Sequence, residues 1–162
     1  MELNQKARKN SLMLCHYLSP SHILLLPGKV SKETVIDGLL ERLCELSHLK
    51  DVESVKKAVW DREKEGRTVL ENGLAIPHAR VPNLDELKSC LAIIPESYLD
   101  PVENVRVNEV FLFLSPQDHF EAHLQMLAKI SRVFQDPIFI DNLLKVATPE
   151  DAFTLIQRQE RV

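Results

Sequence analysis

The stretch Asp61–Arg80 reads D-R-E-K-E-G-R-T-V-L-E-N-G-L-A-I-P-H-A-R and places a histidine, His78, directly after a proline. It begins as the charged end of a helix, passes a glycine and then turns at Asn72-Gly73, a dipeptide that tolerates positive φ. Pro77 fixes its own φ at about −65° and holds the preceding residue extended. We therefore expect His78 on a stiff backbone, at the exit of a short apolar strand over residues 74–76.

Arginines stand on both sides of this histidine, at Arg62, Arg67 and Arg80. An imidazole nitrogen can attack phosphorus, and planar guanidinium groups match the oxygens of a phosphoryl group. A histidine on a rigid backbone among arginines therefore suits a phosphoryl carrier. Taken in isolation, a Pro-His pair more often only caps a turn, and by spacing alone Arg62 is a surface arginine at a helix end. We expect Arg67 and Arg80 to be surface charges.

Composition excludes several classes of protein. The net charge of −4 provides no overall basic field for nucleic acid or an anionic membrane. The longest apolar runs are far too short to cross a bilayer, and the N-terminus lacks the pattern of a signal peptide. The three cysteines are widely spaced and odd in number, which favours a reduced, cytoplasmic protein. Four glycines form no P-loop or dinucleotide fingerprint, so no cofactor is expected.

Hydrophobic periodicity predicts a mixed fold. Helices are expected at residues 31–48, 51–64, 119–135 and 138–146, with a further one beginning at Thr148. Core strands are expected at residues 22–26, 90–94 and 110–114, with 105–107 as a separate short strand and 95–102 as a turn region after Pro95. This order predicts an α/β fold, a three-layer α/β/α sandwich with helices covering a mixed sheet. We expect a flexible arm at residues 1–10 and one domain at 11–162.

Two motifs carry a resemblance to a known family. The pattern R-E-K-x-G-x-T followed by N-G-L-A-I-P-H, and the later H-L-x-x-L at His123, resemble enzyme IIA domains of the bacterial phosphoenolpyruvate-dependent phosphotransferase system, of the type 2 fructose/mannitol/nitrogen-regulatory group. The resemblance implies that His78 accepts a phosphoryl group from phosphorylated HPr, with Arg62 contacting that group. It also implies a supporting role for His123, which donates a hydrogen bond to the phosphoryl group or orients His78. Thr68 matches a family threonine.

The same resemblance leaves the acceptor open. A sugar-transport protein would pass the phosphoryl group to a IIB component, whereas a nitrogen-regulatory protein would use its phosphorylation state to control other proteins. The 162-residue chain without IIB, IIC or membrane segment slightly favours regulation. Neither the sugar, the regulatory target nor the phosphorylated ring nitrogen can be predicted.

Two other functions remain open. The first is a protein-binding module that keeps the fold but accepts no phosphoryl group, although such a module has no need of His78, Arg62 and His123 together. The second is a metal-dependent hydrolase, because His119 and His123 are four residues apart and can share one face of a helix. The sequence H-F-E-A-H is not the zinc motif H-E-x-x-H, however, so we expect no metal site.

Overall fold

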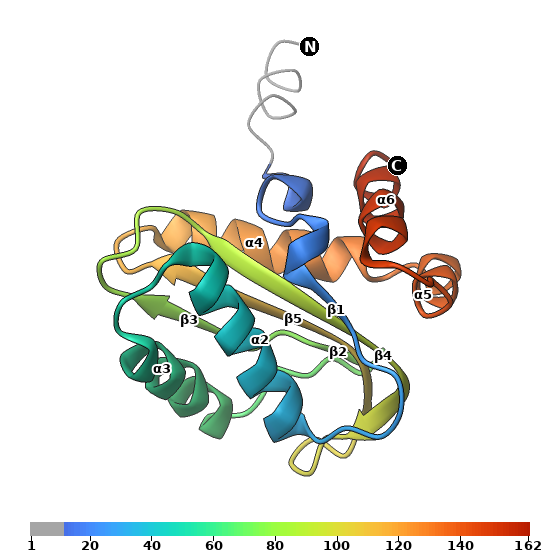
Figure 1. Cartoon of the computed structure of the whole chain (residues 1–162), viewed down its shortest axis with the longest axis horizontal. Coiled ribbons are helices and arrows are strands. Elements are labelled where there is room, and N and C mark those ends of the chain that lie inside the picture. Colours follow the sequence, from blue (N-terminus) through green and yellow to red (C-terminus); the bar gives the residue numbers. More distant parts are fainter. Residues whose placement is uncertain (1–11) are drawn as a thin grey trace.

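The structure is a computed structural model that describes residues 12–162. The N-terminal arm expected at residues 1–10 lies outside the described residues. A five-stranded mixed sheet forms the centre of the molecule (Figure 1). Its strands are β1 (Ile23–Leu25), β2 (Leu74–Ala75), β3 (His78–Val81), β4 (Lys88–Leu99) and β5 (Arg106–Pro116).

The long hairpin of β4 and β5 is the middle of the sheet, because all other strands pair with one of its two members. β4 and β5 are antiparallel to each other, β1 is parallel to β4, and both β2 and β3 are parallel to β5. The sheet order is β1-β4-β5-β2, with β3 also beside β5. The sheet is therefore mixed, as the sequence predicted.

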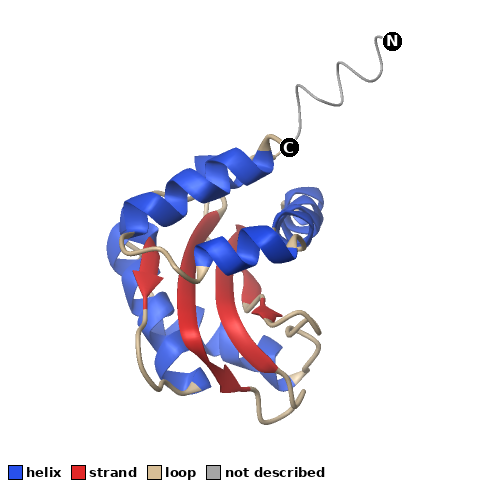
Figure 2. Cartoon of the chain, turned by 90° about the vertical axis from the view of Figure 1, so that its right-hand side faces the viewer, coloured by secondary structure: helices blue, strands red, loops and turns tan. Residues whose placement is uncertain are grey.

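Helices cover both faces of this sheet, and each face has its own apolar core. The helices α2 (Lys32–Ser47) and α3 (Val52–Lys64) pack on one face. On the other face lie α4 (Phe120–Val133), α5 (Pro137–Leu143) and α6 (Pro149–Glu160), together with two short 3₁₀ turns at Leu14–His16 and Pro20–His22 (Figure 2). The three-layer α/β/α sandwich is confirmed.

Helix starts agree with the capping residues in the sequence. The side chains of Ser31, Asp51 and Thr148 accept hydrogen bonds from the backbone N–H groups of Thr34, Ser54 and Asp151. α3 ends at Lys64, and Gly66 follows with a φ of 74°, which suits glycine best. Among the described residues, no helix is long and apolar enough to span a membrane.

Two predictions about the central hairpin were wrong. β4 does not end at Pro95 but continues to Leu99, and the register with β5 shifts between Ile93 and Tyr98. A proline cannot donate a ladder hydrogen bond, and an irregularity in the pairing accommodates it. Residues 105–107 are not a separate strand, because Arg106 is already the first residue of β5.

The backbone around His78 also differs from the expected strand exit. β2 is only two residues long, and the chain re-enters the sheet at His78, the first residue of β3. Pro77 lies between these two short strands, and its carbonyl accepts a hydrogen bond of 3.1 Å from the Phe113 N–H of β5. His78 is thereby fixed beside Phe113, its register partner on β5.

Candidate active site: two histidines in a cleft lined by arginines

An open cleft of about 600 Å³ lies where the end of α3, the strand β3 and the start of α4 meet. Three of the predicted site residues, His78, Arg62 and His123, line this cleft. The other residues that line the cleft are Ala58, Asp61, Glu65, Ala79, Arg80, Gln117, Phe120, Leu124 and Leu127. Residues up to 69 positions apart in the sequence (from 58 to 127) therefore meet at one place.

His78 is held by the backbone that precedes it. Its Nδ1 lies 2.6 Å from the carbonyl oxygen of Ile76. A carbonyl oxygen only accepts hydrogen bonds, so Nδ1 carries the proton and donates. In the neutral ring the remaining nitrogen, Nε2, then has the free lone pair. His78 is 7% exposed, so this nitrogen is presented from a largely buried ring.

The surroundings of His78 keep its ring neutral. The ring stacks on Phe113, with centroids 5.3 Å apart and planes within 9°. Burial lowers the pKa of His78 below its ordinary value, and the positive charge of Arg62 lowers it further, against an opposing effect of the hydrogen bond to Ile76. A neutral ring with a free Nε2 is the state that a nucleophile requires.

His123 lies beside His78, with ring centroids 5.1 Å apart and planes tilted by 59°. It comes from α4, is 8% exposed, and its Nδ1 is hydrogen-bonded to the hydroxyl of Ser115 on β5. Burial lowers the pKa of His123 to about 4, with further lowering by His78, Arg80 and Arg62. This second ring is therefore also neutral near pH 7.

The two arginines of the cleft are held differently. Arg62, in the last turn of α3, donates from Nη1 to the Gly66 carbonyl at 2.8 Å and has Glu65 at 3.8 Å. Arg80, on β3, is exposed and lies over the ring of Phe120, 5.3 Å from its centroid. Arg62 was expected from the sequence, whereas Arg80 was expected to be an ordinary surface charge. Arg67 is exposed and does not line the cleft.

Thr68 is not among the residues that line the cleft. It is buried, and its hydroxyl donates to Oε2 of Glu63 at 3.0 Å. The same carboxylate oxygen lies 3.2 Å from Nζ of Lys32, which in turn lies 2.9 Å from Oδ2 of Asp100. Glu63 directly follows Arg62, so this buried cluster anchors the end of α3 that carries the arginine.

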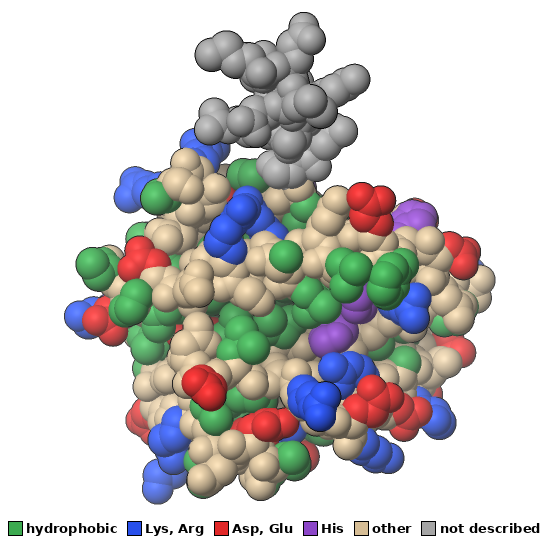
Figure 3. Space-filling model, turned by 180° about the vertical axis from the view of Figure 1, so that it is seen from behind, with side chains coloured by type: hydrophobic (Ala, Val, Ile, Leu, Met, Phe, Trp, Pro, Cys, Tyr) green, Lys and Arg blue, Asp and Glu red, His purple; other side chains and the backbone are tan. Residues whose placement is uncertain are grey.

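The rim of the cleft is apolar on the α4 side. Phe120 is 56% exposed and Leu124 is 49% exposed, and they stand four residues apart on the same helix. Figure 3 shows this face, with histidine atoms between a hydrophobic patch and cationic side chains. An exposed apolar patch beside polar groups is typical of a protein-docking surface.

The pair His119 and His123 does not form a metal site in the described residues. His119 precedes α4 and is exposed, while His123 is buried and bonded to Ser115. Across residues 12–162, no three side chains of His, Cys, Asp or Glu are grouped to hold a metal ion. The donor set that a zinc hydrolase requires is thus not assembled here.

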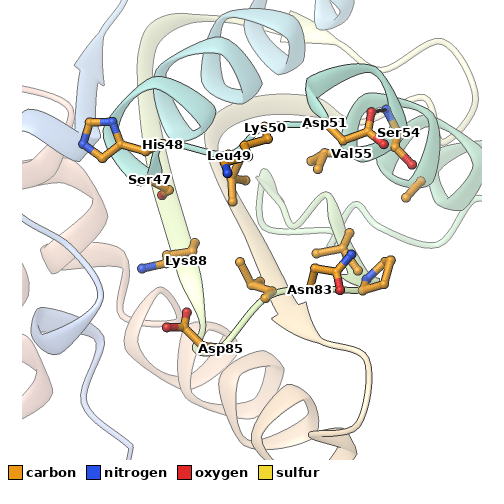
Figure 4. Close-up of a pocket in the computed structure, with 14 residues that line it drawn as sticks. Ser47, His48, Leu49, Lys50, Asp51, Ser54, Val55, Asn83, Asp85 and Lys88 are labelled. Carbon is orange, nitrogen blue, oxygen red and sulfur yellow. Dashed lines mark hydrogen bonds between the residues drawn. The ribbon is translucent and has the colours of Figure 1, made fainter.

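A second open pocket, of about 730 Å³, lies between the α2–α3 connection and the β3–β4 turn (Figure 4). His48, Lys50, Asp51, Asp85 and Lys88 are around it. The acidic and basic groups are mixed, and Lys88 is already paired with Glu86 at 2.7 Å. The cleft at His78 is smaller, but it brings together two histidines and two arginines, so it is the candidate active site.

Sequence reasoning missed several residues of this site, namely Arg80, Phe113, Ser115, Gln117 and Phe120. Arg80, Phe113 and Ser115 are brought to the site by the pairing of β3 with β5, which places residues 78–81 beside residues 113–116. Strand pairing between distant segments cannot be derived from periodicity alone.

Comparison with known proteins gives the family. The family model described as "Phosphoenolpyruvate-dependent sugar phosphotransferase system, EIIA 2" matches residues 16–159. The chain belongs to this family. IIA components are phosphotransferases that accept a phosphoryl group on a histidine, and this agrees with the resemblance found at the N-G-L-A-I-P-H segment.

Relatives of both functional kinds are found. A nitrogen regulatory protein of Bradyrhizobium diazoefficiens is 29% identical over 120 residues, which are 74% of this chain and 78% of that protein. The 2-O-alpha-mannosyl-D-glycerate-specific EIIABC component of Escherichia coli is 26% identical over 130 residues, which are 78% of this chain but only 20% of that larger protein.

Solved structures show the same fold. The nitrogen regulatory protein IIA-Ntr of Neisseria meningitidis superimposes with a TM-score of 0.77 at 26% identity, over 88% of this chain and 98% of that one. Enzyme IIAMTL of Escherichia coli, solved in complex with phosphorylated enzyme IIBMTL, gives a TM-score of 0.68 at 18% identity, over 87% and 97% of the two chains. At that identity the second likeness shows the fold alone.

Proposed function

We propose that His78 is the phosphoryl acceptor of this IIA protein and that Nε2 is the phosphorylated atom. The observation that carries this proposal is the contact of 2.6 Å between Nδ1 and the Ile76 carbonyl, which leaves Nε2 as the nitrogen with a free lone pair. Nε2 attacks the phosphorus, a new N–P bond forms, and the bond to the donor breaks with its electron pair returning to the donor. Residues 11–162 act as one phosphocarrier domain in this proposal.

Arg62 and Arg80 stabilise the transferred group. Both guanidinium groups line the cleft that holds His78, and their planar arrays of N–H donors match phosphoryl oxygens. Phosphoryl transfer depends mainly on positioning and on cations that spread the charge of the equatorial oxygens. His123 lines the same cleft and supplies a neutral ring rather than a third charge.

The apolar rim at Phe120 and Leu124 is the proposed docking surface for the donor and acceptor proteins. Direct transfer between two proteins requires that the acceptor histidine lie within the interface. His78 is in a cleft beside two exposed apolar side chains, so a partner that covers them also covers the histidine. The donor proposed from the family resemblance is phosphorylated HPr, and the protein acts in the cytoplasm.

The onward step has two candidate forms. Nitrogen regulatory proteins match this chain over most of their own length, so we propose a regulatory IIA protein whose phosphorylation state controls its binding to a target. A sugar-specific IIA protein that phosphorylates a IIB component is the second candidate, supported by the mannosylglycerate and fructose relatives.

The test is phosphoryl transfer in vitro. The full chain is incubated with enzyme I, HPr and phosphoenolpyruvate, and intact mass is measured before and after acid treatment. We expect one acid-labile, base-stable phosphoryl group that is lost in His78→Ala. It should persist in His119→Ala, a control at an exposed histidine outside the cleft. Absence of labelling with an active donor system would instead support a protein-binding module that accepts no phosphoryl group.

A further inference from the structure

The hydroxyl of Ser115 is a buried polar group that is hydrogen-bonded to His123. Ser115 lies on β5, opposite Arg80 of β3 in the strand register, and is 0% exposed. Its Oγ is within hydrogen-bond distance of Nδ1 of His123, and among residues 12–162 it has no other hydrogen-bond partner. Ser115 follows a run of buried apolar residues on this strand, and a buried hydroxyl in such surroundings is unfavourable unless it is hydrogen-bonded.

The contact between Ser115 and His123 admits two arrangements of protons. In the first, the serine O–H donates to an unprotonated Nδ1, and the neutral His123 ring carries its proton on Nε2. In the second, Nδ1–H donates to the serine oxygen, and the serine proton is left without an acceptor. A buried donor without a partner is unfavourable, so the first arrangement is preferred.

His78 has the opposite arrangement for an equally simple reason. Its Nδ1 faces the carbonyl of Ile76, which accepts only, so its proton is on Nδ1. The two rings are 5.1 Å apart and line one cleft. His78 therefore has a lone pair on Nε2, whereas His123 has a proton on its Nε2.

We propose that Ser115 is a positioning residue that fixes His123 in the Nε2–H tautomer, so that His123 donates a hydrogen bond to the phosphoryl group on His78. This proposal deepens the proposed function and rests on it only for the identity of the acceptor. With the other tautomer, His123 would direct a lone pair at the phosphoryl oxygens and repel them. Ser115 itself touches neither partner protein nor phosphoryl group; it acts through His123.

The tautomers can be measured on the unphosphorylated protein. Nitrogen-15 NMR of the imidazole rings at pH 7 distinguishes protonated from unprotonated ring nitrogens. We expect Nε2–H for His123 and Nδ1–H for His78, with assignments made in His123→Gln and His78→Gln variants. If His123 carries its proton on Nδ1, the proposal is overturned. Because this reading requires no donor protein, it stands apart from success or failure of the transfer assay.

A matched pair of variants tests the role of the hydroxyl. Ser115→Thr keeps the hydroxyl, whereas Ser115→Val lacks it. Threonine and valine have nearly the same shape, so both variants add similar bulk and β-branching at this strand position. We expect Ser115→Val to mix the two tautomers of His123 and to slow phosphoryl transfer about tenfold relative to Ser115→Thr, the loss expected for one hydrogen bond to a charged group. Equal rates and equal tautomers in two folded variants would rule out a positioning role.

Discussion

The imidazole of His78 lies flat on the ring of Phe113, with centroids 5.3 Å apart and planes within 9°. This stack, together with the hydrogen bond to Ile76, leaves the His78 ring little freedom to rotate. We expect Phe113→Leu to loosen the ring and to slow phosphoryl transfer several-fold, and the loss of buried ring atoms to cost about 1–3 kcal/mol of stability.

The matched control for Phe113 is on the same strand. Phe111→Leu alters an equally buried ring that packs edge-on against Phe134 instead of a histidine. Urea unfolding should show comparable losses for the two variants, while only Phe113→Leu slows transfer. Comparable slowing in both would indicate that the core, rather than the stack, supports the rate.

Arg62→Lys keeps a positive charge but loses the planar fork that can contact two phosphoryl oxygens. We expect transfer to fall by about tenfold or more, since such guanidinium contacts stabilise the transferred group. Arg67→Lys is the control, because Arg67 is exposed and outside the cleft. Stopped-flow or quenched-mass kinetics measures both, and an unchanged rate in Arg62→Lys contradicts the assigned contact.

Transfer to His78 should be insensitive to pH between about 7 and 8. Protonation removes the Nε2 lone pair, and the pKa of His78 is lowered below 6.5 by burial and by Arg62. The rate should therefore fall only as the pH drops below 6.5 toward the lowered pKa. NMR titration of His78 gives the same pKa independently, and a midpoint above 6.5 would contradict the neutral-ring account.

Lys32 bridges two buried carboxylates, Glu63 and Asp100, at 3.2 and 2.9 Å. Lys32→Met leaves both without their cation, so we expect the free energy of unfolding to fall by about 3–5 kcal/mol. Lys57→Met removes the exposed pair with Asp61 instead and should change the free energy of unfolding far less, because solvent screens an exposed ion pair. Urea unfolding of the two variants measures the difference directly, and equal losses would show that burial of the pair is unimportant.

Glu109 is buried at 1% exposure on β5, and burial raises the pKa of its carboxyl to about 8. A pKa raised above the unfolded value of 4.5 adds stability below pH 4.5, and this contribution disappears as the pH rises toward 8. Glu109→Gln cannot ionise, so its unfolding free energy should decline less between pH 5 and 8 than that of the wild type. Urea unfolding at several pH values measures both proteins. If their free energies of unfolding changed equally between pH 5 and 8, Glu109 would already be ionised in the folded protein.

The sequence predicts those parts of the fold whose causes are local. Ser31, Asp51 and Thr148 each cap a helix through their own side chains, so the starts of α2, α3 and α6 were correct. The predicted end of the strand at Pro95 was wrong, because β4 pairs with β5 again at Tyr98 and Leu99. This pairing outweighs the local preference of proline.

The site shows the same division between local and distant causes. The sequence singled out His78, Arg62 and His123 through motif and resemblance, and these three residues meet in the cleft. Thr68 was expected beside them, but its hydroxyl is bonded to Glu63 and it lies outside the lining. The contributions of Phe113 and Ser115 depend on strand register, which no local pattern encodes.

The two histidines differ in how their orientation can be changed by mutation. His78 is aimed by a main-chain carbonyl, and every residue type at position 76 has that group. His123 is aimed by a side chain, so a single amino-acid change at position 115 alters it. A single substitution at position 115 can therefore change the orientation of His123, whereas any substitution at position 76 retains the carbonyl group that orients His78. Members of the family with altered transfer rates are expected to vary at position 115 and to retain the backbone path through Pro77.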